Sequence, residues 1–194
     1  MSPQVWWHLA RASGIVAWAL LAAAVVWGLL LSTRLARGRP SPAWLADLHR
    51  FLGASAVAST VLHLAALLAD GYVDFGVADL LVPYAAGWKP GAVALGVLSL
   101  YLLAVVEGTS LAMRRIPRRV WRGLHLGSYV LFWSATFHFV LAGTDAPHPL
   151  ARAGVDLVAA LVVFLTLVRI LSPRPRALSR TSRPRRAQPA AGRS

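Results

Sequence analysis

The sequence has no cysteine and little negative charge, and both absences narrow its function. Without thiolates the chain cannot form disulfides or hold an iron–sulfur cluster, so histidine is its best ligand for a transition metal. Seven Asp and Glu stand against 20 Lys and Arg, which gives a net charge of +13. No glycine-rich turn of the kind that binds dinucleotide phosphates follows a strand, so we expect this chain to bind no flavin or NAD itself.

What the chain does contain is long apolar runs. Hydrophobic residues make up 57% of it, and a run of about 20 such residues is long enough for a helix to cross the hydrocarbon core of a bilayer. The five helices expected on this basis lie at about 13–33, 43–69, 90–113, 120–143 and 150–171. We therefore predict an all-α fold class, a polytopic membrane helical bundle of about five transmembrane helices, with one domain over 1–172. A short interfacial helix is expected in the longest loop, at about 70–89.

The basic residues gather on one side of the predicted bundle. If the 34–42 loop lies inside the cell, 17 of the 20 Lys and Arg fall on the inner side and only Arg11, Lys89 and Arg152 on the outer side. This positive-inside distribution predicts a multi-pass protein of the cytoplasmic membrane with its N-terminus outside. It explains the net charge through contact with the lipid bilayer, without a nucleic acid partner. Residues 173–194 lack periodicity, and we expect a disordered, basic cytoplasmic tail there.

Four histidines lie inside two of the apolar segments at nearly equal spacings. His49 and His63 are fourteen residues apart, and His125 and His138 are thirteen apart. At 1.5 Å per residue these spacings correspond to about 21 Å and about 19–20 Å along a helix. One further transmembrane segment lies between these two in the sequence, so both cross the bilayer in the same direction. This places His49 at the depth of His125 and His63 at the depth of His138. Ionisable side chains are costly inside a membrane, so this arrangement indicates a functional site.

Two imidazole pairs at two depths predict two metal centres stacked across the bilayer. A heme between parallel helices takes one imidazole from each, which leaves iron no open position and suits electron transfer. A zinc or copper site would need its ligands within a few ångströms of one another. Two alternatives remain: a monoheme or quinol-linked subunit in which one pair binds, and a non-redox membrane scaffold whose histidines only hydrogen-bond between helices.

The thirteen-residue spacing sets a geometric condition. At about 100° per residue, fourteen positions return within about 40° of the same helix face, whereas thirteen positions fall about 140° short. We therefore expect the segment at 120–143 to be tightened or kinked, or its two hemes to lie on different sides of it.

Charged residues near the two levels are candidates for binding heme propionates. Arg50 and Arg122 lie near the inner level and are expected to bind the cofactor there, and Lys89 is the candidate at the outer level. Glu107 lies within the third apolar segment. It either hydrogen-bonds to a neighbouring helix or belongs to a proton or quinone path, and the sequence leaves its role open.

Two stretches resemble the ferric reductase-like transmembrane domain family. They are residues 49–53 with His63, and residues 118–125 with His138 and the following 142–145; together the likeness covers roughly 43–145. That family includes NADPH oxidases, ferric reductases and the heme subunit of a bacterial methionine sulfoxide reductase system. The fourteen-and-thirteen spacing is that of its NADPH-oxidase branch.

The resemblance implies heme b between His49 and His125 and again between His63 and His138, so that metal ligation falls to these four histidines. It also implies electron flow from the cytoplasm outward. The chain departs from the family in lacking a flavin or nicotinamide domain, so a separate flavin reductase or a quinol must supply electrons. We expect a transmembrane diheme cytochrome, a ferric reductase-like oxidoreductase component without a catalytic residue of its own. The sequence leaves open whether it turns over an acceptor or only relays electrons.

Overall fold

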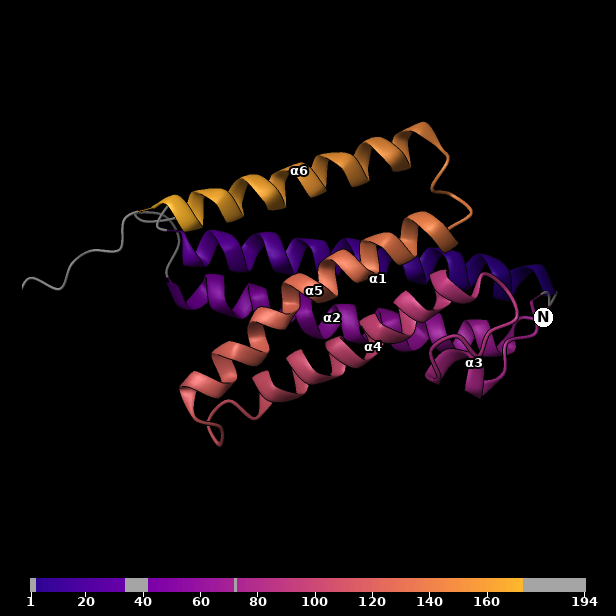
Figure 1. Ribbon diagram of the computed structural model, residues 1–194, viewed down its shortest axis with the longest axis horizontal. Helices are drawn as coiled ribbons and strands as arrows, with labels where there is room; N and C mark the ends of the chain where they lie inside the picture. Colours follow the sequence, from indigo (N-terminus) through magenta and orange to yellow (C-terminus); the bar gives the residue numbers. More distant parts are fainter. Residues whose placement is uncertain (1–2, 34–41, 72, 173–194) are drawn as a thin grey trace, which may run out of the picture.

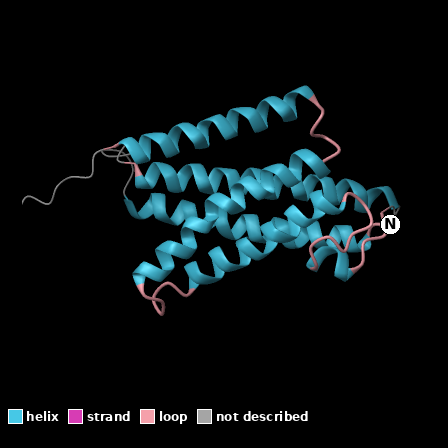
Figure 2. Cartoon of the chain, in the orientation of Figure 1, coloured by secondary structure: helices cyan, strands magenta, loops and turns pink. Residues whose placement is uncertain are grey.

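The computed structural model describes residues 3–33, 42–71 and 73–172, and every regular element among them is a helix (Figures 1 and 2). The elements are α1 (Pro3–Ser32), α2 (Pro42–Ala69), α3 (Val77–Leu81), α4 (Pro90–Leu111), α5 (Arg118–Ala142) and α6 (Pro149–Leu171). Five of them are long and apolar enough to cross a membrane. The predicted all-α membrane bundle is therefore confirmed, and the chain is a multi-pass membrane protein.

The helix bounds differ from the prediction mainly at the start of α1. This helix begins at Pro3 instead of near residue 13, because Arg11 does not end it. Arg11 lies inside this helix, and its guanidinium pairs with Asp145. A short helix lies within the 70–89 loop, as expected, and is α3. The predicted tail at 173–194 and most of the 34–42 loop lie outside the described residues.

Four of the helices begin at a proline, namely α1, α2, α4 and α6. Pro90 and Pro149 are the first residues of α4 and α6. At this position the fixed φ of proline suits the helix and its missing N–H has no partner to lose. His148 precedes α6 as its N-cap, and its Nδ1 accepts a hydrogen bond from the backbone N–H of Leu150 at 3.3 Å. His148 is exposed and has this capping role, and His8 is exposed on α1.

The transmembrane helices form two hairpins and one further helix. α1 packs along α2, α4 packs along α5, and α6 packs against α1 (Figure 1). A buried apolar cluster joins α1, α5 and α6 through Ala22, Val25, Leu29, Phe132, Val162 and Leu165. We call the interface between the α1–α2 hairpin and the α4–α5 hairpin the seam. We use inner and outer for the bundle ends expected to face the cytoplasm and the exterior.

The segment from 73 to 88, including α3, covers the outer end of the seam. The Tyr101 hydroxyl on α4 donates to the carbonyl of Leu81 at 2.6 Å and ties α3 to the bundle. Phe75 meets the ring of Trp88 edge to face and packs against a buried cluster that includes Val93. Apolar side chains of this segment therefore line the outer end of the seam.

Candidate functional site

The inner pair, His49 and His125, meets across the seam. His49 comes from α2 and His125 from α5, and their ring centres are 6.0 Å apart with an angle of 72° between the planes. Trp121 lies one turn before His125 and stacks on its ring, with centres 5.1 Å apart and an interplanar angle of 23°. The two rings expected at the inner depth are therefore brought together.

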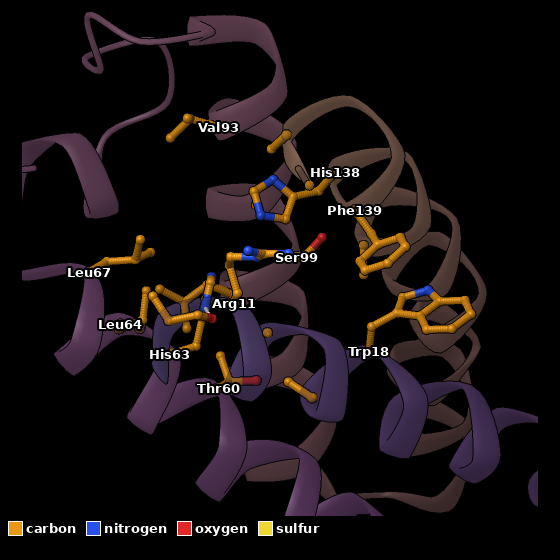
Figure 3. A pocket seen from close by; sticks show the side chains of 18 of the residues that line it. Arg11, Trp18, Thr60, His63, Leu64, Leu67, Val93, Ser99, His138 and Phe139 are labelled. Atoms are coloured by element: carbon orange, nitrogen blue, oxygen red, sulfur yellow. Dashed lines mark hydrogen bonds between the residues drawn. The ribbon is translucent and has the colours of Figure 1, made fainter. Parts of the chain in front are cut away.

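The outer pair, His63 and His138, lines a shared cavity. This outer cavity has a volume of about 280 Å³, and residues of α1, α2, α4 and α5 line it. Figure 3 shows both imidazoles at its walls, each coming from a different hairpin. Phe75, Leu80 and Trp88 add apolar surface at its outer end. The cavity is mostly apolar, so its few charged groups stand out.

Three of the four imidazoles form a hydrogen bond with a backbone carbonyl of the other helix in the same hairpin. Nδ1–H donates from His49 to Ala24 at 3.1 Å, from His63 to Ala10 at 2.7 Å and from His138 to Ala92 at 2.7 Å. A carbonyl can only accept, so Nδ1 must carry a proton, and in the neutral imidazole Nε2 then keeps its lone pair. Metal-binding imidazoles are usually oriented in this way.

A glycine makes room for each of these three rings. It follows the carbonyl by four residues, so the sequence Ala-x-x-x-Gly occurs at 10–14, 24–28 and 92–96. A Cβ added at Gly96 would lie 2.7 Å from Cε1 of His138, and one at Gly14 would lie 3.0 Å from His63. At Gly28 the distance to His49 would be 3.2 Å. An added Cβ would clash with the ring at Gly96, and at Gly14 and Gly28 the ring would have to shift by a few tenths of an ångström.

The fourth ring, His125, has a different partner. Its Nδ1 lies 3.4 Å from the hydroxyl oxygen of Ser110 on α4. Both histidines of α5 therefore reach α4, and α5 is one uninterrupted helix from Arg118 to Ala142. The expectation that this helix is tightened or kinked, or that its two hemes lie on different sides of it, stays a prediction.

Arg11 is the charged residue at the outer cavity that sequence reasoning missed. Its side chain points into the cavity between His63 and His138 (Figure 3). Its Nε donates to Asp145 at 2.9 Å, a second nitrogen pairs with the same carboxylate, and the guanidinium lies 4.1 Å from the ring centre of Trp7. Its position at the end of an apolar run indicated only a helix boundary.

The arginines and the lysine expected at the two levels have other surroundings. Arg50 is exposed and donates to Asp47 at 2.8 Å, and Arg122 is exposed near the start of α5. Lys89 donates to the carbonyl of Leu141 at 2.8 Å. Among the described residues, no hydrogen bond or ion pair joins these three cations to the four histidines. Their binding of propionates stays a prediction.

Glu107 lies in α4, three residues before Ser110, and its carboxylate faces α2. A Cβ added at Gly53 would lie 2.5 Å from its Oε1. Gly53 follows His49 by one turn, so this carboxylate lies close to the level of the inner pair. The structure thus gives Glu107 a place between the two hairpins, while its chemical role stays open.

Two buried polar atoms lack a hydrogen-bond partner among the described residues, and each lies beside one of the two histidine pairs. Oδ1 of Asp70 belongs to a residue that lines the outer cavity, and Nε1 of Trp121 belongs to the ring stacked on His125. A buried polar atom without a partner costs free energy, so each calls for a bound group or water.

No three His, Asp or Glu side chains within the described ranges could together hold a metal ion. A heme needs only two, since the porphyrin supplies four nitrogens, and the residues present fit it.

A family model described as the ferric reductase like transmembrane component matches residues 13–136. The comparisons with curated proteins and with solved structures found no match. The matched segment includes α2 and α4 completely and most of α1 and α5. Transmembrane domains of this kind generally bind heme and serve as membrane electron-transfer components. Because the match spans more than half of the sequence, the chain belongs to the ferric reductase-like transmembrane family.

Proposed function

We propose that the chain is a transmembrane b-type cytochrome with two heme sites, one at the inner pair and one at the outer pair. It passes electrons from a donor on the cytoplasmic side to an acceptor on the outer side. The observation that carries the proposal is that each pair takes one imidazole from each hairpin. Three of the four rings have Nδ1 fixed on a carbonyl and Nε2 free.

At the inner level, His49 and His125 are the residues that would hold the heme. The observed distance between the two ring centres is 6.0 Å. Heme iron with two imidazole ligands supplies single-electron transfer without binding substrate at the metal. Trp121 stabilises the orientation of His125 by stacking on it.

At the outer level, His63 and His138 are the proposed ligands in the outer cavity. Arg11 offers a cation in an otherwise mostly apolar space, and its remaining N–H groups suit an anionic group such as a propionate. Its ion pair with Asp145 holds the guanidinium in place. The 73–88 segment adds apolar side chains at the outer end. Together these residues would bind and orient the heme and partly desolvate it.

The donor is proposed to be a separate flavin reductase or a quinol on the cytoplasmic side. The α4–α5 turn and the start of α5 present the exposed arginines Arg114, Arg115, Arg118, Arg119 and Arg122 at the inner end. Such a basic surface favours an acidic partner protein or anionic lipid. Within the cytoplasmic membrane, this face would lie at the side from which electrons enter.

One observation favours the monoheme alternative. Both outer rings bind a carbonyl at 2.7 Å, whereas His125 has only a hydroxyl at 3.4 Å. If one site alone binds heme, the outer site is better prepared to do so. The count of hemes per chain separates the two functions.

The test is a reduced-minus-oxidised spectrum of the purified protein, with heme and protein quantified together. We expect two hemes per chain in the wild type and one in His63→Ala. His148→Ala, which changes an exposed histidine outside the seam, is the matched control and should retain both. One heme in the wild type would favour the monoheme function. A colourless protein after heme supplementation would refute both.

A further inference from the structure

Ser110 interrupts a regular arrangement on the helices that face the histidines. α1 presents a carbonyl and a glycine at Ala10 and Gly14, and again fourteen residues later at 24 and 28. On α4 the same pair occurs at 92 and 96, and fourteen residues later the chain has Val106 and Ser110. A serine thus stands at the position that holds a glycine beside the other three rings.

The hydroxyl of Ser110 links His125 to the carbonyl at this fourth position. It donates to the carbonyl of Val106 at 2.7 Å, and its oxygen lies 3.4 Å from Nδ1 of His125. Because the hydroxyl proton is used on the carbonyl, only lone pairs remain for the imidazole. Nδ1 must then be the donor, which leaves Nε2 unprotonated, as in the other three histidines.

The spacing of the histidines explains why a link is needed here. On α2 the histidines repeat every fourteen residues, the same interval as the carbonyls of α1. On α5 the two histidines are thirteen residues apart, whereas the carbonyls that face them on α4, at Ala92 and Val106, are fourteen apart. One residue of difference amounts to about 1.5 Å along the axis and about 100° around it. His138 meets its carbonyl directly, so the mismatch falls on His125, and the serine hydroxyl spans the added distance.

We propose that Ser110 is the positioning residue of the inner site: its hydroxyl fixes the tautomer of His125 and directs Nε2 into the seam. This inference rests on the proposed function, because it concerns how an axial ligand is held. A hydrogen bond on Nδ1 makes the imidazole a stronger donor to a metal. The bond to Ser110 is longer than those of the outer pair and therefore weaker. The two sites are thus unequal, and the hydroxyl tunes only the inner one.

Ser110→Ala tests the role of the hydroxyl in the complete heme-loaded protein. Removing it weakens the donation of His125 to ferric iron, so the midpoint potential of one heme should rise. The low-spin EPR signal of that heme should shift as well, and both properties of the other heme should stay as in the wild type. Ser110→Thr keeps a hydroxyl in the same position and should restore both properties.

Thr109→Ala is the matched control. The Thr109 hydroxyl also bonds to carbonyls of its own helix, at 2.6 Å to Val105 and 3.2 Å to Val106, and within the described part of the chain it forms no hydrogen bond with a histidine. Loss of one heme in Ser110→Ala alone, with Ser110→Thr intact, would also support the role. Unchanged potentials and EPR signals in Ser110→Ala, or equal losses in all three variants, would overturn it. Neither result touches the proposed function, which is decided by the number of hemes that the wild type binds.

Discussion

Arg11 in α1 and Asp145 just beyond α5 form an ion pair that joins the two hairpins at the outer end of the seam. The side chains of both residues are about 30% exposed, at 31% and 30%. The guanidinium also lies over Trp7 and lines the outer cavity. This ion pair thus helps to connect the two halves of the bundle and also positions a cation next to the outer histidines.

Arg11→Gln should destabilise the protein by about 1–3 kcal/mol, because it leaves a half-buried carboxylate without its charged partner. Asp145→Asn should cost a similar amount, and the double variant should cost less than the sum of the two. Thermal or denaturant unfolding in detergent measures these differences. Arg152→Gln breaks an ion pair whose side chains are more than 60% exposed and should have little effect. Additive losses from Arg11 and Asp145 would contradict a direct coupling.

Gly96→Ala should displace His138 from the carbonyl of Ala92 and lower occupancy of the proposed outer heme site. The added Cβ would lie 2.7 Å from Cε1 of the ring. Gly108→Ala on the same helix meets no atom within 4 Å and should be neutral or stabilise the helix by up to about 1 kcal/mol. Heme content per chain and unfolding temperature measure both effects. Equal heme content in the two variants would show that ring clearance at Gly96 is unimportant.

Trp121→Phe should weaken retention of the inner heme without destabilising the heme-free protein. The substitution keeps a ring that can stack on His125 and removes an N–H that is buried without a partner. If that N–H donates to the bound heme, its removal should speed heme transfer to a scavenging protein severalfold. Trp133→Phe changes a ring that packs between Phe132 and Phe137 and serves as the control. A heme-free variant much less stable than the wild type would indicate a packing role instead.

The transmembrane spans followed from the sequence because they depend on local quantities. The length of each apolar run gave the five helices, and counting residues placed His49 at the depth of His125. Both inferences need only the rise of a helix and the number of crossings between segments. The structure brings the inner pair to 6.0 Å and places the outer pair in one cavity.

The contacts that hold the rings were harder to predict because they depend on helix rotation. The fourteen-residue repeat of Gly14 and Gly28 was visible in the sequence and matches the interval from His49 to His63. That these glycines make room for the histidines could be inferred only by knowing that the face of α1 carrying them packs against α2. The partner of Arg11 lies 134 residues away, so its direction could not be inferred locally. Arg50, beside a histidine in sequence, instead bonds to Asp47 on the exposed face.

The hairpin architecture has a consequence for biogenesis. His49 and His63 are braced by α1, and His138 by α4, so these imidazoles need no contact across the seam to be oriented. We expect each half to insert into the bilayer as a unit with its rings already aimed. Heme would then join two preformed hairpins, and its binding would be the last step of maturation.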